Sequence, residues 1–182
     1  MNYTIIGTIS YILFYIYDIN EIKKNNKIIK GAFILGLILQ IGATIGIIYD
    51  NLEYLKISAW GIAITIFGIT FLIYSLFFAL PFKETYVKQG EKRTVYKKGV
   101  YAMSRHPGVI FYIIFYIGLA ILQPTITNIS TYIIWSLLNL SYIIFQDLWT
   151  FPRAFDDYQK YRQTTPFLIP TLKSIKSSID II

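Results

Sequence analysis

Three residues suited to chemistry stand together where an apolar stretch of the sequence begins. Arg105, His106 and Pro107 directly precede the run that starts at Gly108, and His106 is the only histidine of the chain. Proline suits the first turn of a helix, because its missing N–H group costs no hydrogen bond there. His106 would then cap the helix, near free backbone N–H groups and the positive end of the helix dipole. An arginine, an imidazole and a helix amino terminus together favour the binding of a carboxylate or a phosphate.

These three residues also fit a simpler interpretation. Arg105 would extend to lipid phosphates at a membrane surface, with its apolar stem in the bilayer, and His106 would only be tolerated there. The local sequence alone does not decide between an anion site and a lipid-facing arginine.

A second polar segment, residues 145–170, follows the last apolar run. It opens with the amide of Gln146 and the acid of Asp147, and it continues with Tyr158 and Tyr161 at helical spacing beside two basic residues. By itself this pattern also fits an amphipathic helix that lies on a membrane surface.

Composition indicates a membrane protein. The chain has 182 residues, of which 55% are hydrophobic and 15% charged, and its mean hydropathy is +0.52. A soluble domain carries roughly a quarter charged residues.

Cysteine is absent, which excludes disulfides, thiolate zinc sites and cysteine nucleophiles, and we expect no metal site. The net charge of +7 lies in the connections between apolar runs, which favours an anionic membrane surface over nucleic acid as the partner.

Five apolar runs contain no Asp, Glu, Lys or Arg: about Tyr3–Tyr17, Gly31–Tyr49, Ile57–Phe82, Gly108–Gln123 and Ile129–Gln146. Their apolar residues are continuous rather than alternating, which predicts helices and not strands. A bilayer core takes about 20 residues, so the first and fourth runs need flanking residues to cross it. The first run lacks a basic leader and a cleavage site, so we expect a retained helix rather than a signal peptide. The sequence therefore predicts one domain, an all-α integral membrane protein of about five transmembrane helices.

The basic residues predict the orientation of these helices. The connections carry four, one, seven and no Lys or Arg in chain order, and the tail after Gln146 carries five. This alternation predicts a multi-pass protein of the cell membrane with its amino terminus outside and its carboxyl terminus in the cytoplasm. The polar segments Lys83–Arg105 and Asp147–Ile182 then face the same compartment, where we expect the chemistry to occur.

Taken together, the two polar segments resemble one family. The stretch "GVYAMSRHPGV" (Gly99–Val109) is similar to the Gly-x-Tyr-x-x-x-Arg-His-Pro signature of isoprenylcysteine carboxyl methyltransferases and their bacterial relatives. The stretch "QDLWTFPRAFDDYQKYRQTTPFLIP" (Gln146–Pro170) resembles that family's acidic pair, Tyr-x-x-Tyr and Pro-x-x-x-Pro ending. Phospholipid and small-thiol methyltransferases share much of this pattern, and membrane steroid reductases share the general layout. The resemblance covers roughly residues 89–170.

The resemblance implies an S-adenosylmethionine site at the cytoplasmic face, within residues 83–182, closed by a carboxyl-terminal helical segment. The implied cofactor-binding residues are Gln89, Arg93, Thr94, Val95, Tyr96, Tyr101, Arg105, His106, Pro107, Gly108, Val109, Gln146 and Asp147. The methionyl carboxylate would suit the helix start beside Arg105 and His106. No residue stands out as a general base, so the catalytic residue stays unassigned.

Departures from the family pattern bear on the substrate. The first acid of the family's pair is Gln146 here, and Asp147 is the remaining carboxylate. Where the prenylcysteine enzymes carry a substrate-binding arginine, this chain has Tyr142, which we take as the candidate substrate-binding residue. The expected substrate is a lipophilic small molecule or lipidated acceptor, either a prenylcysteine-like carboxylate or another lipid or thiol. The alternatives are an inactive membrane scaffold of the same fold and a membrane reductase that uses NADPH.

Overall fold

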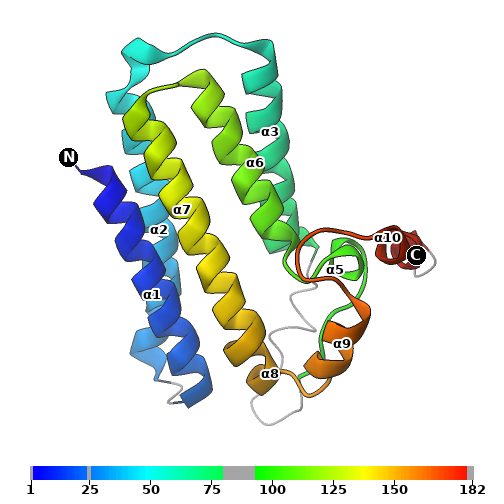
Figure 1. The fold of residues 1–182 in the computed structure, drawn as a ribbon. Helices are drawn as coiled ribbons and strands as arrows, with labels where there is room; N and C mark the ends of the chain where they lie inside the picture. Colours follow the sequence, from blue (N-terminus) through cyan, green and yellow to red (C-terminus); the bar gives the residue numbers. More distant parts are fainter. Residues whose placement is uncertain (1, 24–25, 80–92, 180–182) are drawn as a thin grey trace.

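The computed structural model describes residues 2–23, 26–79 and 93–179, and the regular elements in these ranges are helical (Figure 1). The chain begins with a hairpin of α1 (Tyr3–Lys23) and α2 (Lys27–Asp50). The short 3-10 turn η1 (Leu52–Tyr54) leads to α3 (Ala59–Ile73), which continues as the π turn η2 (Tyr74–Phe78). The later elements are α5 (Val100–Met103), α6 (Pro107–Leu122), α7 (Ile126–Phe145), the π turn η3 (Gln146–Thr150), α8 (Phe151–Ala154), α9 (Tyr158–Thr164) and α10 (Leu172–Ile179).

Each predicted apolar run forms a helix, and the protein is an all-α integral membrane protein. In the described ranges, four helical stretches are long and apolar enough to cross a membrane: Tyr3–Lys23, Lys27–Asp50, Ala59–Phe78 and Ile126–Ala154. The fifth apolar helix, α6, is shorter and spans 16 residues. Pro107 occupies its first turn and Pro124 follows its end, so proline limits the helix on both sides. The end of the third predicted run, residues 80–82, lies outside the described residues.

Glycines bring α3 and α6 into close contact. A Cβ atom added to Gly68 would lie 2.5 Å from the backbone nitrogen of Phe115, and one added to Gly118 would lie 2.6 Å from that of Thr65. Small residues at such positions let two helix backbones approach closely in a membrane, where packing replaces the hydrophobic effect as the driving force. This pair of helices therefore forms a rigid unit that ends at the start of α6.

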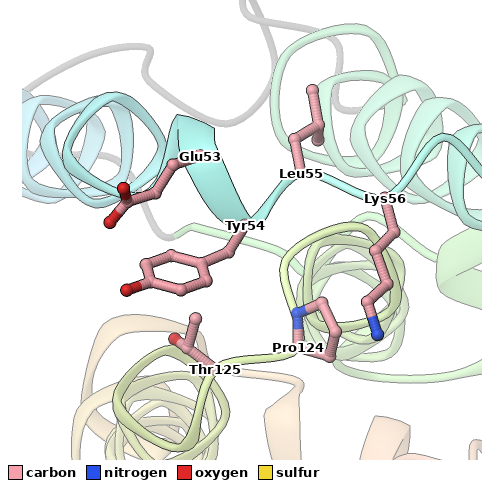
Figure 2. Close-up of a pocket in the computed structure, with 6 residues that line it drawn as sticks. All are labelled: Glu53, Tyr54, Leu55, Lys56, Pro124 and Thr125. Carbon is pink, nitrogen blue, oxygen red and sulfur yellow. The ribbon is translucent and has the colours of Figure 1, made fainter.

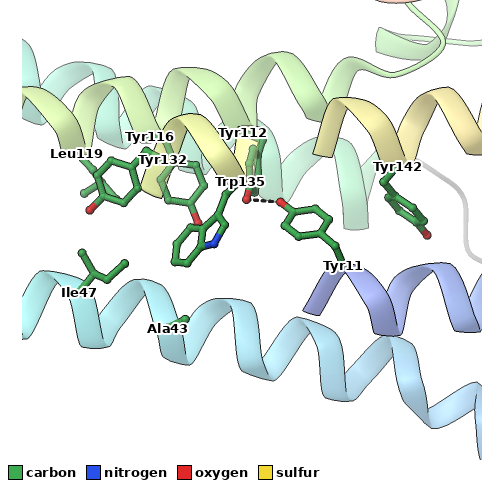
Figure 3. Close-up of a cluster of buried hydrophobic side chains, with 9 residues drawn as sticks. All are labelled: Tyr11, Ala43, Ile47, Tyr112, Tyr116, Leu119, Tyr132, Trp135 and Tyr142. Atoms are coloured by element: carbon green, nitrogen blue, oxygen red, sulfur yellow. Dashed lines mark hydrogen bonds between the residues drawn. The ribbon is translucent and has the colours of Figure 1, made fainter. Parts of the chain in front are cut away.

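The interior of the bundle is aromatic and contains a polar chain of hydroxyl and amide groups. Figure 3 shows the buried cluster, in which the Tyr11 hydroxyl meets the Tyr112 hydroxyl. Gln40 of α2 accepts a hydrogen bond from Ser10 and donates to the hydroxyls of Tyr112 and Tyr116 at 3.2 and 3.0 Å. These bonds join α1, α2 and α6 across the bundle, because a polar group in lipid must find its partner within the protein.

The two ends of the bundle differ. At one end, the η1 connection meets the α6–α7 connection, where the Lys56 backbone N–H donates to the Leu122 carbonyl at 2.7 Å. A hollow of about 320 Å³ lies between these connections, lined by Glu53, Tyr54, Leu55, Lys56, Pro124 and Thr125 (Figure 2). At the other end, α5 and the segments after α7 gather beside the start of α6 (Figure 1). This second end holds the residues that the sequence singles out.

Candidate functional site

The junction between α5 and α6 is built by the Arg105–His106–Pro107 sequence. His106 is the N-cap of α6 and Pro107 is in the first turn, as predicted, but the His106 side chain makes no capping hydrogen bond. The imidazole is buried, with 6% of the residue exposed. It stacks on the Phe151 ring at 5.8 Å and meets the edge of the Phe167 ring at 5.1 Å. His106 is therefore an interior residue and does not face lipid.

Asp147 is the centre of a charged cluster at this junction. Its carboxylate lies 3.0 Å from Arg105 Nε, 3.4 Å from His106 Nε2 and 3.4 Å from Arg162 Nε. The Tyr158 hydroxyl donates a hydrogen bond to Asp147 Oδ1 at 2.6 Å. We call these five residues the Asp147 cluster. The structure thus brings together two residues before α6, one in η3 and two in α9, and these elements are far apart in sequence.

The carboxyl-terminal segment closes over the junction. The Arg105 backbone N–H donates to the Pro166 carbonyl at 3.0 Å, and the Arg105 guanidinium lies over the Phe167 ring at 5.6 Å. In α9, the Tyr161 hydroxyl donates to the Tyr101 carbonyl at 2.5 Å. At α10, the Ser174 hydroxyl donates to the carbonyl of the residue that ends α5, at 2.9 Å. The carboxyl-terminal segment therefore lies over the start of α6, where the family resemblance implies a closing segment.

The Asp147 cluster carries more positive than negative charge. Arg105 and Arg162 are charged at neutral pH, while Asp147 supplies one carboxylate. Burial lowers the pKa of His106 below its ordinary value; the hydrogen bond to Asp147 opposes this shift and the Arg105 charge adds to it. The imidazole is therefore neutral at pH 7. Burial, together with the hydrogen bond to Asp147, raises the pKa of the Tyr158 hydroxyl, which stays a donor.

Arg105 is paired with Asp147 in this arrangement. Its Nε atom lies 3.0 Å from Asp147 Oδ1, Nη2 donates to Asp147 Oδ2 at 3.3 Å, and Nη1 donates to the Arg162 carbonyl at 2.9 Å. Because one carboxylate faces two guanidinium groups, the excess positive charge of the cluster fits a ligand carboxylate.

The predicted stretch Arg93–Tyr96 lies between α1 and α9. The Val95 backbone N–H donates to Asp157 Oδ1 at 2.8 Å, and Arg93 pairs with Glu21 of α1 at 3.1 Å. Thr94 is exposed, and the Tyr96 ring meets the edge of the Tyr101 ring at 6.5 Å. These contacts join the stretch to α1, α5 and the start of α9 and not to the Asp147 cluster. Gln89 lies outside the described residues.

Gly108 and Val109 complete the start of α6. Gly108 faces α3 and η2, because a Cβ atom added to it would lie 3.3 Å from the Ser75 hydroxyl, and Val109 is buried. The Tyr101 hydroxyl donates to the Ser75 carbonyl at 2.8 Å. These predicted residues therefore position the junction against α3 and η2.

Gln146 belongs to a different group of side chains from its neighbour Asp147. Gln146 Nε2 donates to the Tyr142 hydroxyl at 2.9 Å, and the Thr150 hydroxyl donates to Asp18 Oδ2 of α1 at 3.2 Å. The side chains of Gln146 and Tyr142 are also neighbours of Asp18. We call these four residues the Asp18 cluster. Sequence reasoning did not identify Asp18, although an acid just after an apolar run is a signal that marks it.

Comparison with known proteins assigns the family. Residues 57–155, more than half of the chain, match the family model described as phospholipid methyltransferase. The comparison with curated proteins found no match, and the comparison with solved structures found none either. The matched region runs from just before α3 to the end of α8, so it contains Arg105, His106 and Asp147 but not α1. The resemblance to the broader methyltransferase group is confirmed, and the narrower isoprenylcysteine group stays a prediction. The chain belongs to the phospholipid methyltransferase family and is a membrane methyltransferase.

Proposed function

We propose that the protein uses S-adenosylmethionine to methylate a lipophilic acceptor that enters from the bilayer. The observation that carries this proposal is the Asp147 cluster, which is buried and has excess positive charge at the start of α6 within the family region. The cofactor carries one carboxylate on its methionyl part, and the cluster has the capacity for one further anion.

The chain's own residues would bind and orient the cofactor. Arg105 and the backbone N–H groups at the start of α6 would hold the carboxylate, and the neutral His106 would donate or accept a hydrogen bond beside it. The tyrosine rings at positions 96, 101 and 158 are candidates to pack against the adenine. The bound cofactor supplies a methyl group on a sulfonium, which is already activated for transfer. The protein would then need only to align the acceptor and to exclude water. The carboxyl-terminal segment, which lies over Arg105, favours the exclusion of water.

The acceptor would approach from the apolar side of the site. Tyr142 is buried on α7 with 7% of the residue exposed, one turn before the π turn that carries Asp147. Its hydroxyl would hydrogen-bond a polar group of the acceptor while the apolar chain of the acceptor stays among the helices. The acceptor classes that we propose are a lipid, a prenylcysteine-like carboxylate or a thiol.

Replacing His106 with alanine tests the cofactor site. We expect His106→Ala to weaken S-adenosylmethionine binding by about 1–3 kcal/mol, because a buried hydrogen-bonding partner is lost. Isothermal calorimetry on the purified protein measures this change, and Tyr54→Ala at the opposite end of the bundle is the control, expected to bind normally.

Two results would contradict the proposal. One is unchanged affinity in a folded His106→Ala protein. The other is thermal protection of the wild type by NADPH and not by S-adenosylmethionine, which would support a reductase instead. Incubating membranes with methyl-labelled cofactor, and tracing the label into lipid, protein and volatile fractions, identifies the acceptor.

The proposed orientation makes a separate prediction about accessibility. Because the chain has no cysteine, single cysteines can be introduced at Glu53, beside the hollow in Figure 2, and at Lys98, just before α5. We expect an impermeant thiol reagent to label Glu53→Cys on intact cells and to label Lys98→Cys only after permeabilisation. Labelling of Lys98→Cys from outside would reverse the orientation and place the site on the other side of the membrane.

A further inference from the structure

Asp18 is a buried carboxylate that has no cationic partner among the described residues. It lies near the end of α1, and 3% of the residue is exposed. Its neighbours are the neutral side chains of Thr150, Gln146 and Tyr142. Among residues 2–23, 26–79 and 93–179, no lysine, arginine or histidine forms an ion pair with it. A carboxylate buried in this way is costly unless a positive charge compensates it.

Glu21, one turn along the same helix, provides a contrast. Its carboxylate pairs with Lys30 at 3.6 Å and with Arg93 at 3.1 Å. Its side chain is also more exposed, at 16%. The helix therefore has basic residues within reach of Glu21, while the described neighbours of the Asp18 carboxylate are hydroxyl and amide groups. The Asp18 cluster therefore has the composition of a binding site for a cationic group.

The π turn η3 joins this site to the Asp147 cluster. Asp147 in η3 contacts Arg105 before α6, whereas Thr150 in the same turn contacts Asp18 of α1. Two groups of opposite character therefore flank one turn of helix. The Asp147 cluster has excess positive charge, and the Asp18 cluster has a carboxylate with no cation paired to it among the described residues. A ligand that carries both a carboxylate and a positive charge would complete both groups.

We propose that Asp18 binds the positive charge of S-adenosylmethionine, with Gln146 and Thr150 as hydrogen-bonding neighbours. This inference rests on the proposed function, and it places a residue of α1, outside the matched family region, in the cofactor site. The cofactor has two cationic groups, an ammonium and a sulfonium, and either one satisfies a carboxylate. S-adenosylhomocysteine keeps the ammonium and lacks the sulfonium, so the two ligands distinguish which group Asp18 binds.

The test compares four purified full-length proteins: the wild type, Asp18→Asn, Gln146→Glu with Asp18→Asn, and Asp50→Asn. Asp50 is an exposed acid at the opposite end of the bundle and controls for the loss of one negative charge. Calorimetry measures the affinity of each protein for S-adenosylmethionine and for S-adenosylhomocysteine. Thermal unfolding without ligand measures the stability of each protein.

We expect Asp18→Asn to weaken S-adenosylmethionine binding roughly 10- to 100-fold, as expected for a lost charge-assisted contact. Gln146→Glu should restore most of the affinity in the double variant, because it returns a carboxylate to the same cluster. Without ligand, Asp18→Asn should unfold at the same or a higher temperature, since it removes an uncompensated buried charge. A purely structural Asp18 would lower that temperature, and the glutamate would not restore the affinity.

The outcomes separate this inference from the function on which it rests. Weaker binding of S-adenosylmethionine alone assigns Asp18 to the sulfonium, and weaker binding of both ligands assigns it to the ammonium. Unchanged affinity of Asp18→Asn for both ligands, with normal binding by the wild type, overturns the role of Asp18 and leaves the proposed function intact. A wild type that binds neither ligand overturns both.

Discussion

Replacing Asp147 with alanine is expected to lower the free energy of unfolding by about 3–5 kcal/mol, the usual cost of leaving buried charges without their partner. The carboxylate accepts contacts from Arg105, His106, Tyr158 and Arg162, and its side chain is 4% exposed. Its removal would leave the buried Arg105 without its carboxylate partner, beside the partly exposed Arg162. Chemical denaturation of the protein in detergent, followed by circular dichroism, measures the change.

The same substitution should also release the carboxyl-terminal segment. The contacts of Tyr158 and Arg162 with Asp147 hold α9 against the start of α6. We therefore expect a protease to cleave Asp147→Ala after the end of α8 much faster than it cleaves the wild type. Asp147→Asn keeps one acceptor and should show an intermediate effect. Wild-type stability and cleavage rate in Asp147→Ala would mean that the arginines find other partners, and that the cluster does not hold the segment.

Replacing Gly118 with alanine is expected to separate α3 from α6. The new Cβ atom would lie 2.6 Å from the Thr65 backbone nitrogen, and close to the Thr65 hydroxyl as well. Real Cβ atoms do not come so close to backbone atoms, so the helices must move apart and lose packing along their length. Overpacking of this kind costs about 1–3 kcal/mol and sometimes more, and the same denaturation experiment measures it.

Gly42→Ala is the matched control for this prediction. Gly42 lies within α2, and a Cβ atom added there meets nothing within 4 Å. Alanine favours a helix over glycine by about 1 kcal/mol, so this variant should be as stable as the wild type or more stable. Equal effects of Gly42→Ala and Gly118→Ala would show that helix propensity, and not the contact between α3 and α6, determines the stability.

The helices and the junction could be predicted from the sequence because their signals are local. Continuous apolar runs without charge specify buried or membrane-spanning helices. The position of Pro107 in the first turn of α6 follows from its fixed backbone angle and missing N–H group. The approach of the tail to Arg105 could be predicted only from the family resemblance, since nothing in the separate segments specifies their contact.

The sequence does not predict that neighbouring residues of η3 belong to two different groups of side chains. Gln146 and Asp147 are adjacent in sequence, and both were expected to contact the cofactor from one site. In the structure, Gln146 contacts Tyr142 and Asp147 contacts Arg105. A π turn is rare and has no sequence signature of its own, so the register of residues after it cannot be derived from helical periodicity. The contact between Asp18 and Thr150 escaped sequence reasoning because it depends on that register.

The π turn η3 lies between the membrane helix α7 and the residues that pack at the site. A change of one residue in this turn therefore affects the site without moving α7. In η3 the Phe151 backbone N–H bonds to the Gln146 carbonyl, a span one residue longer than that of an α-helix. One residue corresponds to about 100° of rotation about a helix axis. Deleting one residue from η3 would therefore leave α7 in its place and turn Phe151 away from the His106 ring on which it stacks. A one-residue deletion in η3 is therefore expected to alter the packing at the site while α7 keeps its place in the membrane.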